Sequence, residues 1–356
     1  MNLVLIAIGS VLIVVTLLSR VRSTLWWVRA VDFPRSQVAV LLGLILPAHV
    51  VTMDTQSLFD AGFAVALALC LVYQSARVFP YTRLAPRQVL DATGGDKSRS
   101  IRLLVSNVLM ENRRADAFVE LVRDRDPDVV LAVETDAWWA EQLRDLAADF
   151  PHVIVQPQDN HYGMHLFSKL EVVASAVRYL VEDEIPSMRL TLRLRSGELV
   201  EFFGMHPRPP EPQQDTDERD AELLMVGKEV RACDLPAIVA GDLNDVAWSN
   251  TTRLFQKVSG LLDPRRGRGM FSTFHAGYPL LRWPLDHVFH DQRFTLVELR
   301  RLRSIGSDHF PVLAELQLQP AVAAEQSAPK ADQDDIDDAN ERIAETSRKT
   351  GQSSSR

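Results

Sequence analysis

Three short polar strings follow apolar runs and carry residue types suited to phosphate chemistry. Gly241 to Asn244 reads Gly-Asp-Leu-Asn, Ser307 to His309 reads Ser-Asp-His, and Glu134 directly follows the apolar run Val129 to Val133. Each string supplies a hard oxygen ligand or an acid/base group at the end of an expected buried strand. Mg²⁺ binds such oxygens and neutralises charge on a phosphate group. The strings therefore predict a magnesium site for phosphate ester chemistry.

Each candidate also has an ordinary structural explanation when it is taken alone. Glu134 could be a solvated residue at a strand end. Asp242 and Asn244 could face one site, where the carboxylate accepts a proton from water and the amide orients that water, or they could form an Asx-type turn. Asp308 and His309 could move protons or bind a phosphate oxygen, or they could belong to a turn that enters a strand.

Two other strand ends carry polar residues that could join the same site. His206 follows the run Leu199 to Met205 and enters a proline-rich loop, where a lone histidine is more often structural. Asp286, in the string Pro-Leu-Asp-His, could orient a catalytic histidine or could be a solvated strand residue. Because side chains alternate along a strand, the adjacent His287 is expected to point to the other face of the sheet.

The 356-residue chain has a formal net charge of −8, which bears on its partners. Proteins that grip long nucleic acids usually carry a basic excess, so this charge argues against extended duplex binding. A local cluster of Arg265, Arg266 and Arg268 could still contact a phosphate. The two cysteines, Cys70 and Cys233, are not expected to pair, and they lack the spacing of a thiolate zinc site.

The N-terminal region contains three apolar runs that are typical of membrane helices. They are Asn2 to Leu18, Gln37 to Met53 and Ala61 to Ala76. We therefore expect a membrane anchor of about three transmembrane helices over residues 1–76, or two spans plus a buried or interfacial helix. Arginines follow the first and third runs, and the positive-inside rule then places the large domain in the cytoplasm. The expected location is the inner or plasma membrane.

The remainder divides into a linker over 77–99, a catalytic domain over 100–319 and a disordered tail over 320–356, in which a transient helix could form at Ala339 to Ala344. Helical periodicity is expected over Ala115 to Asp124, Trp138 to Phe150 and Glu218 to Ala232. Many short strands surround these helices, which predicts an α/β fold of two packed, mainly antiparallel sheets flanked by helices. This four-layer sandwich would follow the transmembrane helices. The expected strands are Ile101–Val105, Val129–Val133, Val153–Gln156, Met164–Phe167, Val172–Leu180, Met188–Leu194, Leu199–Met205, Ala237–Ala240, Ser272–Phe274, Leu285–Phe289, Thr295–Leu302 and Val312–Leu318.

The order of the polar strings along the chain resembles the endonuclease/exonuclease/phosphatase superfamily. Its members include deoxyribonuclease I, apurinic endonucleases, sphingomyelinases and inositol polyphosphate 5-phosphatases. Any one string is weak evidence, but the ordered set covers about Ser100 to Leu318. The short loops resemble the small bacterial membrane-associated members. The matching pieces are Ser106-Asn107, Val-Glu-Thr at Glu134, Tyr162 to Ser168, Met-His at His206, Gly241 to Asn244, Leu-Asp-His at Asp286 and Ser307 to His309.

The resemblance implies a metal site and a set of catalytic residues. Mg²⁺, with Mn²⁺ as a possible substitute, would lie near Asn107, Glu134 and Asp308. Many family members have Gln before the glutamate, whereas this chain reads Ala-Val-Glu-Thr. Asp242 and Asn244 would position or activate water. His309 would bind the scissile phosphate or act as acid or base, supported by Asp286. His206 would match the second family histidine.

Two functions of different kinds are compatible with these observations. The first is a membrane-anchored, metal-dependent phosphoesterase that hydrolyses a phosphodiester or phosphomonoester by in-line attack of activated water. Its partners would be the lipid bilayer and a phosphate ester, which could be a nucleic acid, a lipid head group or a soluble ester. The second is a non-catalytic membrane scaffold that retains the fold. Burying unused polar side chains would cost stability, which argues against the scaffold.

Overall fold

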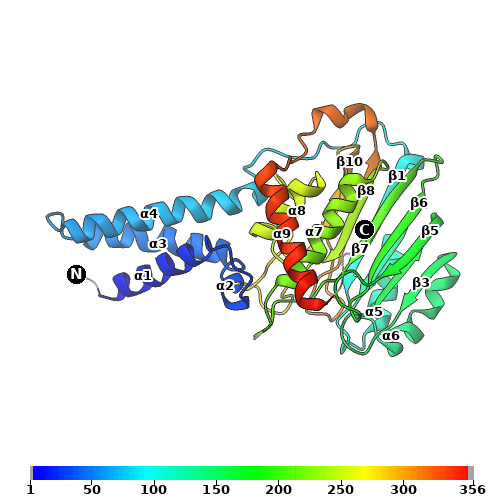
Figure 1. Ribbon diagram of the computed structural model, residues 1–356, viewed down its shortest axis with the longest axis horizontal. Coiled ribbons are helices and arrows are strands. Elements are labelled where there is room, and N and C mark those ends of the chain that lie inside the picture. The colour runs from blue at the N-terminus through cyan, green and yellow to red at the C-terminus, as the bar shows by residue number, and fades with distance from the viewer. Residues whose placement is uncertain (1–2, 213, 352–356) are drawn as a thin grey trace.

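Two β-sheets pack face to face in the computed structural model, which describes residues 3–212 and 214–351 (Figure 1). One sheet has six strands and the other has five. The six-stranded sheet contains β1 (Ser100–Asn107), β2 (Val129–Val133), β3 (His152–Gln156), β4 (Met164–Ser168), β10 (Phe294–Arg301) and β11 (Val312–Leu318). The five-stranded sheet contains β5 (Glu171–Arg178), β6 (Ser187–Arg193), β7 (Leu199–Met205), β8 (Ala237–Asp242) and β9 (Asp286–His290).

Both sheets are mixed, and most neighbouring strands run antiparallel. The strand orders are β10-β11-β1-β2-β4-β3 and β5-β6-β7-β8-β9. The parallel pairs are β1 with β2 and β7 with β8. This architecture confirms the prediction of two packed sheets flanked by helices. The expected strand at Ser272–Phe274 is reduced to isolated bridges from Phe274 to Trp283 and His309.

The main hydrophobic core lies between the two sheets. Leu103 of β1 and Leu131 of β2 belong to it on one side, and Leu190 of β6 and Phe202 of β7 belong to it on the other. Every residue of β2 is buried, because helices cover the opposite face of its sheet. A continuous apolar run such as Val129–Val133 is the pattern expected of a strand that is covered on both faces.

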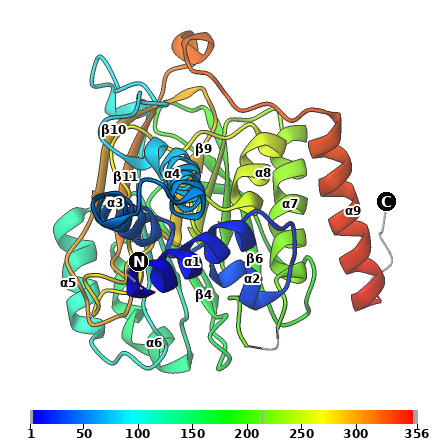
Figure 2. The ribbon, with the colours of Figure 1, turned by 90° about the vertical axis from the view of Figure 1, so that its left-hand side faces the viewer.

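Helices cover the outer face of each sheet, as Figure 2 shows along the direction of the N-terminal helices. The six-stranded sheet is covered by α5 (Ala115–Arg125), α6 (Ala137–Gln142) and the 3-10 helix η3 (Arg144–Ala148), so the single helix expected over Trp138–Phe150 is divided. The five-stranded sheet is covered by α7 (Asp217–Ala232) and α8 (Asn250–Ser259). Helix α8 was not predicted. Its start depends on a local cap, in which the Ser249 side chain accepts a hydrogen bond from the Thr252 backbone N–H.

The C-terminal segment forms a helix that packs against the domain, which corrects the prediction of a disordered tail over 320–356. A short 3-10 helix, η4 (Pro320–Glu325), precedes α9 (Gln333–Thr350), which begins with a capping box and lies outside α7 and α8 (Figure 2). Ala339 is buried in a cluster with Leu224 of α7 and Leu254 of α8. These tertiary contacts order a charge-rich sequence that has little apolar periodicity of its own. The last part of the predicted tail, 352–356, lies outside the described residues.

The predicted linker over 77–99 packs along the catalytic domain. Its two 3-10 helices are η1 (Phe79–Tyr81) and η2 (Lys97–Arg99). The Tyr81 side chain is buried, and its hydroxyl donates to the backbone oxygen of Ala247 over 2.7 Å. Val89 is buried in the main core, and Asp91 forms a bridge to Leu296 of β10.

Three helices project from one side of the sandwich and coincide closely with the predicted apolar runs (Figure 1). They are α1 (Leu3–Leu18), α3 (Arg35–Thr52) and α4 (Leu58–Val78), and the short helix α2 (Trp26–Ala30) lies between α1 and α3. By length and composition, α3 and the stretch of α4 extended to Tyr81 could each cross a membrane, whereas α1 is shorter. Buried core helices and signal sequences pass the same test, so this property alone is weak evidence for membrane insertion.

Candidate active site

The topology brings the predicted polar residues to one edge of the sandwich. Since β1 and β2 are parallel, as are β7 and β8, the carboxyl ends of each pair meet at the same edge of their sheet. Strand β9 runs antiparallel to β8 and therefore begins there, with Asp286 opposite Asp242. Strand β11 runs antiparallel to β1, so the segment before it also lies at this edge. The residues placed there are Asn107, Glu134, His206, Asp242, Asp286, Asp308 and His309.

Asn107 connects the two sheets through its amide group. Its Nδ2 donates to Glu134 Oε1 over 2.6 Å and to Asp242 Oδ2 over 3.0 Å. Its Oδ1 accepts a hydrogen bond from the backbone N–H of Leu109. These contacts let Asn107 position two carboxylates, and its predicted role as a metal ligand stays a prediction.

His309 lies buried between two aspartates. Its Nδ1 is 2.7 Å from Asp286 Oδ2, and its Nε2 is 3.5 Å from Asp242 Oδ2. Burial disfavours the charged ring, but the two carboxylates outweigh burial and raise the pKa of His309 to about 10. Conversely, burial alone would raise the pKa of Asp242, but the His309 charge lowers it. The arrangement holds a protonated imidazole beside an ionised carboxylate, which suits proton transfer and the binding of an anion.

The Gly-Asp-Leu-Asn string forms a tight turn at the end of β8. The backbone N–H of Asn244 donates to Asp242 Oδ1 over 3.0 Å, so the Asx-type turn and the site occur together. Asn244 Nδ2 donates to the backbone oxygen of Pro207 over 2.9 Å. Gly241 has a φ of +146°, and a Cβ at this position would lie 1.8 Å from the backbone oxygen of Met205. Only glycine therefore fits where β7 and β8 approach each other.

His206 lies close to the same turn. It is buried, and its Nε2 is 4.0 Å from Asp242 Oδ2, while its ring contacts that of Tyr162 with centroids 5.7 Å apart. Within the described part of the chain, its Nδ1 has no hydrogen-bond partner. A purely structural role for His206, the alternative raised from the sequence, does not account for its position beside Asp242.

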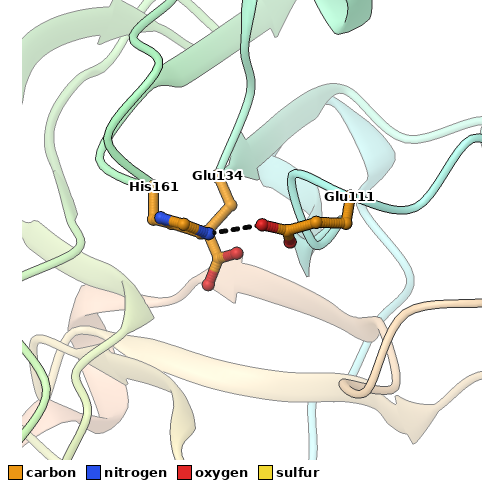
Figure 3. A group of neighbouring side chains, drawn as sticks. All are labelled: Glu111, Glu134 and His161. Atoms are coloured by element: carbon orange, nitrogen blue, oxygen red, sulfur yellow. Dashed lines mark hydrogen bonds and ion pairs between the residues drawn. The ribbon is translucent and has the colours of Figure 1, made fainter.

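Glu134 presents its carboxylate at the mouth of the site. It has a φ of +62°, which is uncommon for a residue other than glycine. Figure 3 shows Glu134 beside the side chains of Glu111 and His161, which come from two loops. One ligand atom from each of the three lies within 4.8 Å of the others, and His161 Nε2 is 2.8 Å from Glu111 Oε1. Sequence reasoning missed Glu111 and His161, because both lie in exposed turns without an apolar pattern around them.

The cavity of the site offers carboxylate oxygens that could hold a divalent metal ion. Glu134 and Asp308 both line it, and hard divalent cations favour carboxylate and water oxygens. The cavity has a volume of about 670 Å³ and includes all the predicted catalytic residues except the buried Asp286. It also includes Trp26 and Phe33 from the N-terminal segment, which sequence reasoning did not assign to the site.

Three other sequence expectations have definite outcomes. His287 points away from the site, as predicted, and contacts the backbone oxygen of Asp245 over 2.9 Å. The expected phosphate contact from the arginine cluster is wrong for Arg265, because that side chain is buried and pairs with Asp263 over 2.8 Å. Both cysteines are free, as expected.

A two-sheet sandwich with an Asp-His-Asp cluster and a facing carboxylate at one sheet edge defines a phosphoesterase-type fold. The family model of the endonuclease/exonuclease/phosphatase family matches residues 104–309, which is more than half of the chain. The protein therefore belongs to this family, whose members are hydrolases acting on phosphate esters. The resemblance inferred from the ordered strings is confirmed at the level of the family.

Solved structures show the same fold at low sequence identity. Humanised D. rerio TDP2 with 14 mutations aligns with a TM-score of 0.52 and 15% identity, covering 62% of this chain and 99% of that one. A family member from Beutenbergia cavernae aligns with a TM-score of 0.52 and 20% identity, covering 62% and 72%. The human Nocturnin catalytic domain with bound sulfate aligns with a TM-score of 0.52 and 15% identity, covering 67% and 99%. No curated protein matches the sequence.

Proposed function

We propose that this protein is a membrane-anchored, Mg²⁺-dependent phosphoesterase that hydrolyses its substrate by in-line attack of water. The observation that carries the proposal is the convergence of Glu134, Asp242 and His309 on one cavity. Mn²⁺ could replace Mg²⁺. The substrate class is a phosphate ester: a nucleic acid, a lipid head group or a soluble ester.

The roles of the site residues follow from their charges and contacts. Glu134 and Asp308 would hold the metal ion, which neutralises charge on the phosphate when bound. Asp242 is the ionised group beside the cavity and accepts the proton of the attacking water, while Asn244 helps to orient that water. His309 is protonated near neutral pH and donates a hydrogen bond to a phosphate oxygen, with Asp286 fixing its ring.

The membrane part of the proposal is supported by the exposed apolar surfaces of the projecting helices. Examples are Val11 of α1, Leu44 of α3 and Leu69 of α4, each more than 60% exposed. Large exposed apolar surfaces favour contact with lipid or with another protein. Arginines near the ends of these helices support a cytoplasmic catalytic domain by the positive-inside rule, and this orientation is part of the proposal.

The test is a hydrolysis assay with the full chain in detergent. The substrates are plasmid DNA, RNA, sphingomyelin, phosphoinositides and a chromogenic diester, each with Mg²⁺, Mn²⁺ or EDTA. We expect metal-dependent hydrolysis that Glu134→Ala and His309→Ala each reduce about 100-fold or more, because one removes a metal ligand and the other a hydrogen-bond donor to the phosphate. Glu120→Ala is the matched control, because Glu120 is exposed on the outer helix α5. Full activity in both site variants would refute the site, and no hydrolysis of any substrate would favour the scaffold.

A further inference from the structure

One wall of the active-site cavity comes from the N-terminal segment. Trp26 and Ala30 of α2 line the cavity together with Phe33 and Pro34, and the acidic and imidazole groups of the catalytic domain line the same cavity. Figure 1 shows α2 between the projecting helices and the sandwich. The segment that joins two predicted membrane helices is therefore part of the substrate site.

Aromatic rings connect this wall to the catalytic histidine. Phe33 packs edge-on against Trp283 with ring centroids 5.7 Å apart. Trp283 stacks on Phe274 at 6.1 Å, and Phe274 lies 4.9 Å from the ring of His309. An apolar surface thus runs from the reacting groups to the start of α3.

Specific hydrogen bonds fix the segment against the catalytic domain. The Trp26 backbone N–H donates to Asp215 Oδ1 over 3.2 Å, and Trp248 Nε1 donates to the backbone oxygen of Asp32 over 2.7 Å. The backbone oxygen of Thr24 accepts from the N–H of Thr216 over 2.8 Å. Because these contacts lie on both sides of α2, the wall is a built part of the cavity.

The apolar surface continues outside the cavity toward the projecting helices. The loop before Trp283 exposes Tyr278, Leu280 and Leu281, and the backbone oxygen of Leu280 accepts a hydrogen bond from Gln37 Nε2 of α3 over 3.0 Å. In Figure 2 the helices α1, α3 and α4 lie in front of the sandwich on the same side as α2. A molecule held among these helices would meet an apolar route to the site.

The charge of the cavity points to the same kind of ligand. Among the described residues that line it, there is no Lys or Arg, whereas Glu134, Glu211, Asp242 and Asp308 are acidic. A polyanion such as DNA or RNA needs several cations along its backbone. A ligand with one phosphate group and an apolar body matches a cavity that is lined by both aromatic rings and the polar groups of the proposed site.

We propose that this wall, through Trp26 and Phe33, acts together with Trp283 to select a membrane lipid that carries a phosphate ester, with its apolar part along these rings and its phosphate at His309. This inference rests on the proposed function. In the reaction, the attacking water gives a proton to Asp242 while its oxygen forms a bond to phosphorus, the P–O ester bond breaks, and the departing alcohol oxygen takes a proton from water. The wall touches the body of the lipid beside the bond that breaks.

The test compares the same head group on long and short chains. Full-length protein with Mg²⁺ is given dioleoyl phospholipids with monoester and diester head groups in mixed micelles, their dibutyroyl counterparts, a chromogenic diester and a DNA oligonucleotide. We expect kcat/KM to be at least 10-fold higher for the dioleoyl lipid than for its dibutyroyl counterpart. Trp26→Ala and Phe33→Ala should lower the ratio of kcat/KM for the dioleoyl lipid to kcat/KM for the dibutyroyl lipid about 10-fold, whereas Trp27→Ala should leave this ratio unchanged. Trp27 adjoins Trp26 but is exposed and does not line the cavity.

A second variant and the substrate panel separate the possible failures. Trp26→Gln replaces the apolar ring with a polar side chain, so it should also lower the ratio of kcat/KM between the two chain lengths while the unfolding temperature stays close to that of the wild type. If the Trp26 and Phe33 variants lost kcat/KM equally on dioleoyl and dibutyroyl lipids, or only on the oligonucleotide, the lipid assignment would be overturned. Cleavage of the chromogenic diester without any lipid preference would overturn this inference alone, and no metal-dependent cleavage of any probe would overturn the proposed function.

Discussion

Replacing Arg29 by methionine tests whether the N-terminal segment and the catalytic domain form one folded unit. Arg29 is buried at the end of α2 and enters a cluster of carboxylates. Its guanidinium lies 3.3 Å from Asp32 and 3.5 Å from Asp245, and it donates to Thr251 Oγ1 over 3.0 Å. Asp245 directly follows Asn244, so this ion network reaches the catalytic turn.

The expected cost follows from the partners that remain. Removing one member of a buried ion pair costs about 3–5 kcal/mol, because a charge stays buried without compensation. In the variant, Asp32 would still pair with Arg35, and Asp245 would still lie 3.9 Å from Arg219. We therefore expect a loss of unfolding free energy at the lower end of this range, about 3 kcal/mol. For a domain of about 150–250 residues, each kcal/mol lowers the melting temperature by about 2–4 °C. Arg29→Met should therefore lower it by about 6–12 °C.

The same substitution should also reduce activity through the catalytic turn. Arg219 donates to the backbone oxygen of Asn244 over 2.7 Å while it pairs with Asp220, so a shift of the network moves that oxygen. The measurement is thermal unfolding of the full chain in detergent, followed by kcat on the substrate found in the hydrolysis panel. Arg22→Met is the control, because Arg22 is exposed on the same segment. An Arg29→Met melting temperature within 2 °C of the control would refute the reasoning.

Three other substitutions test separate parts of the structure. Gly241→Ala should abolish activity and lower the melting temperature, because the added Cβ would collide with the Met205 backbone oxygen. Circular dichroism during heating measures the melting temperature, and an unchanged melting curve would contradict this prediction. Asp286→Asn should lower kcat about 100-fold at saturating Mg²⁺, since His309 loses the carboxylate that fixes its ring; steady-state kinetics would measure it, and a loss confined to KM would contradict it. Burial raises the pKa of Glu222 to about 8, so between pH 4.5 and 8 the unfolded chain loses this proton before the folded chain does, and stability falls as pH rises. Denaturant unfolding at several pH values should show that Glu222→Gln flattens this fall, and an unchanged slope would contradict the assignment.

The sequence predicted the sandwich and the edge that carries the site because both depend on local patterns. Continuous apolar runs such as Val129–Val133 mark strands covered on both faces, and polar residues at their ends mark the site edge. The helix at the C-terminus could not be predicted in the same way. Its stability comes from packing of Ala339 against α7 and α8 and from the pairing of Lys257 with Asp335 over 2.6 Å. Such contacts join residues far apart in the chain, and a single sequence does not show them.

The contribution of the N-terminal segment to the site was hidden for a related physical reason. Trp26 and Trp27 are both amphipathic, and their sequence position suits an interfacial anchor as well as a cavity wall. Only the fold separates them, because α2 turns Trp26 toward the cavity and leaves Trp27 exposed. The same holds for Arg29, which reads as a cytoplasmic flanking charge but is buried against Asp245. A flanking arginine would be free to exchange for lysine, whereas a buried guanidinium with three polar partners would not, so Arg29→Lys should remain measurably less stable than the wild type.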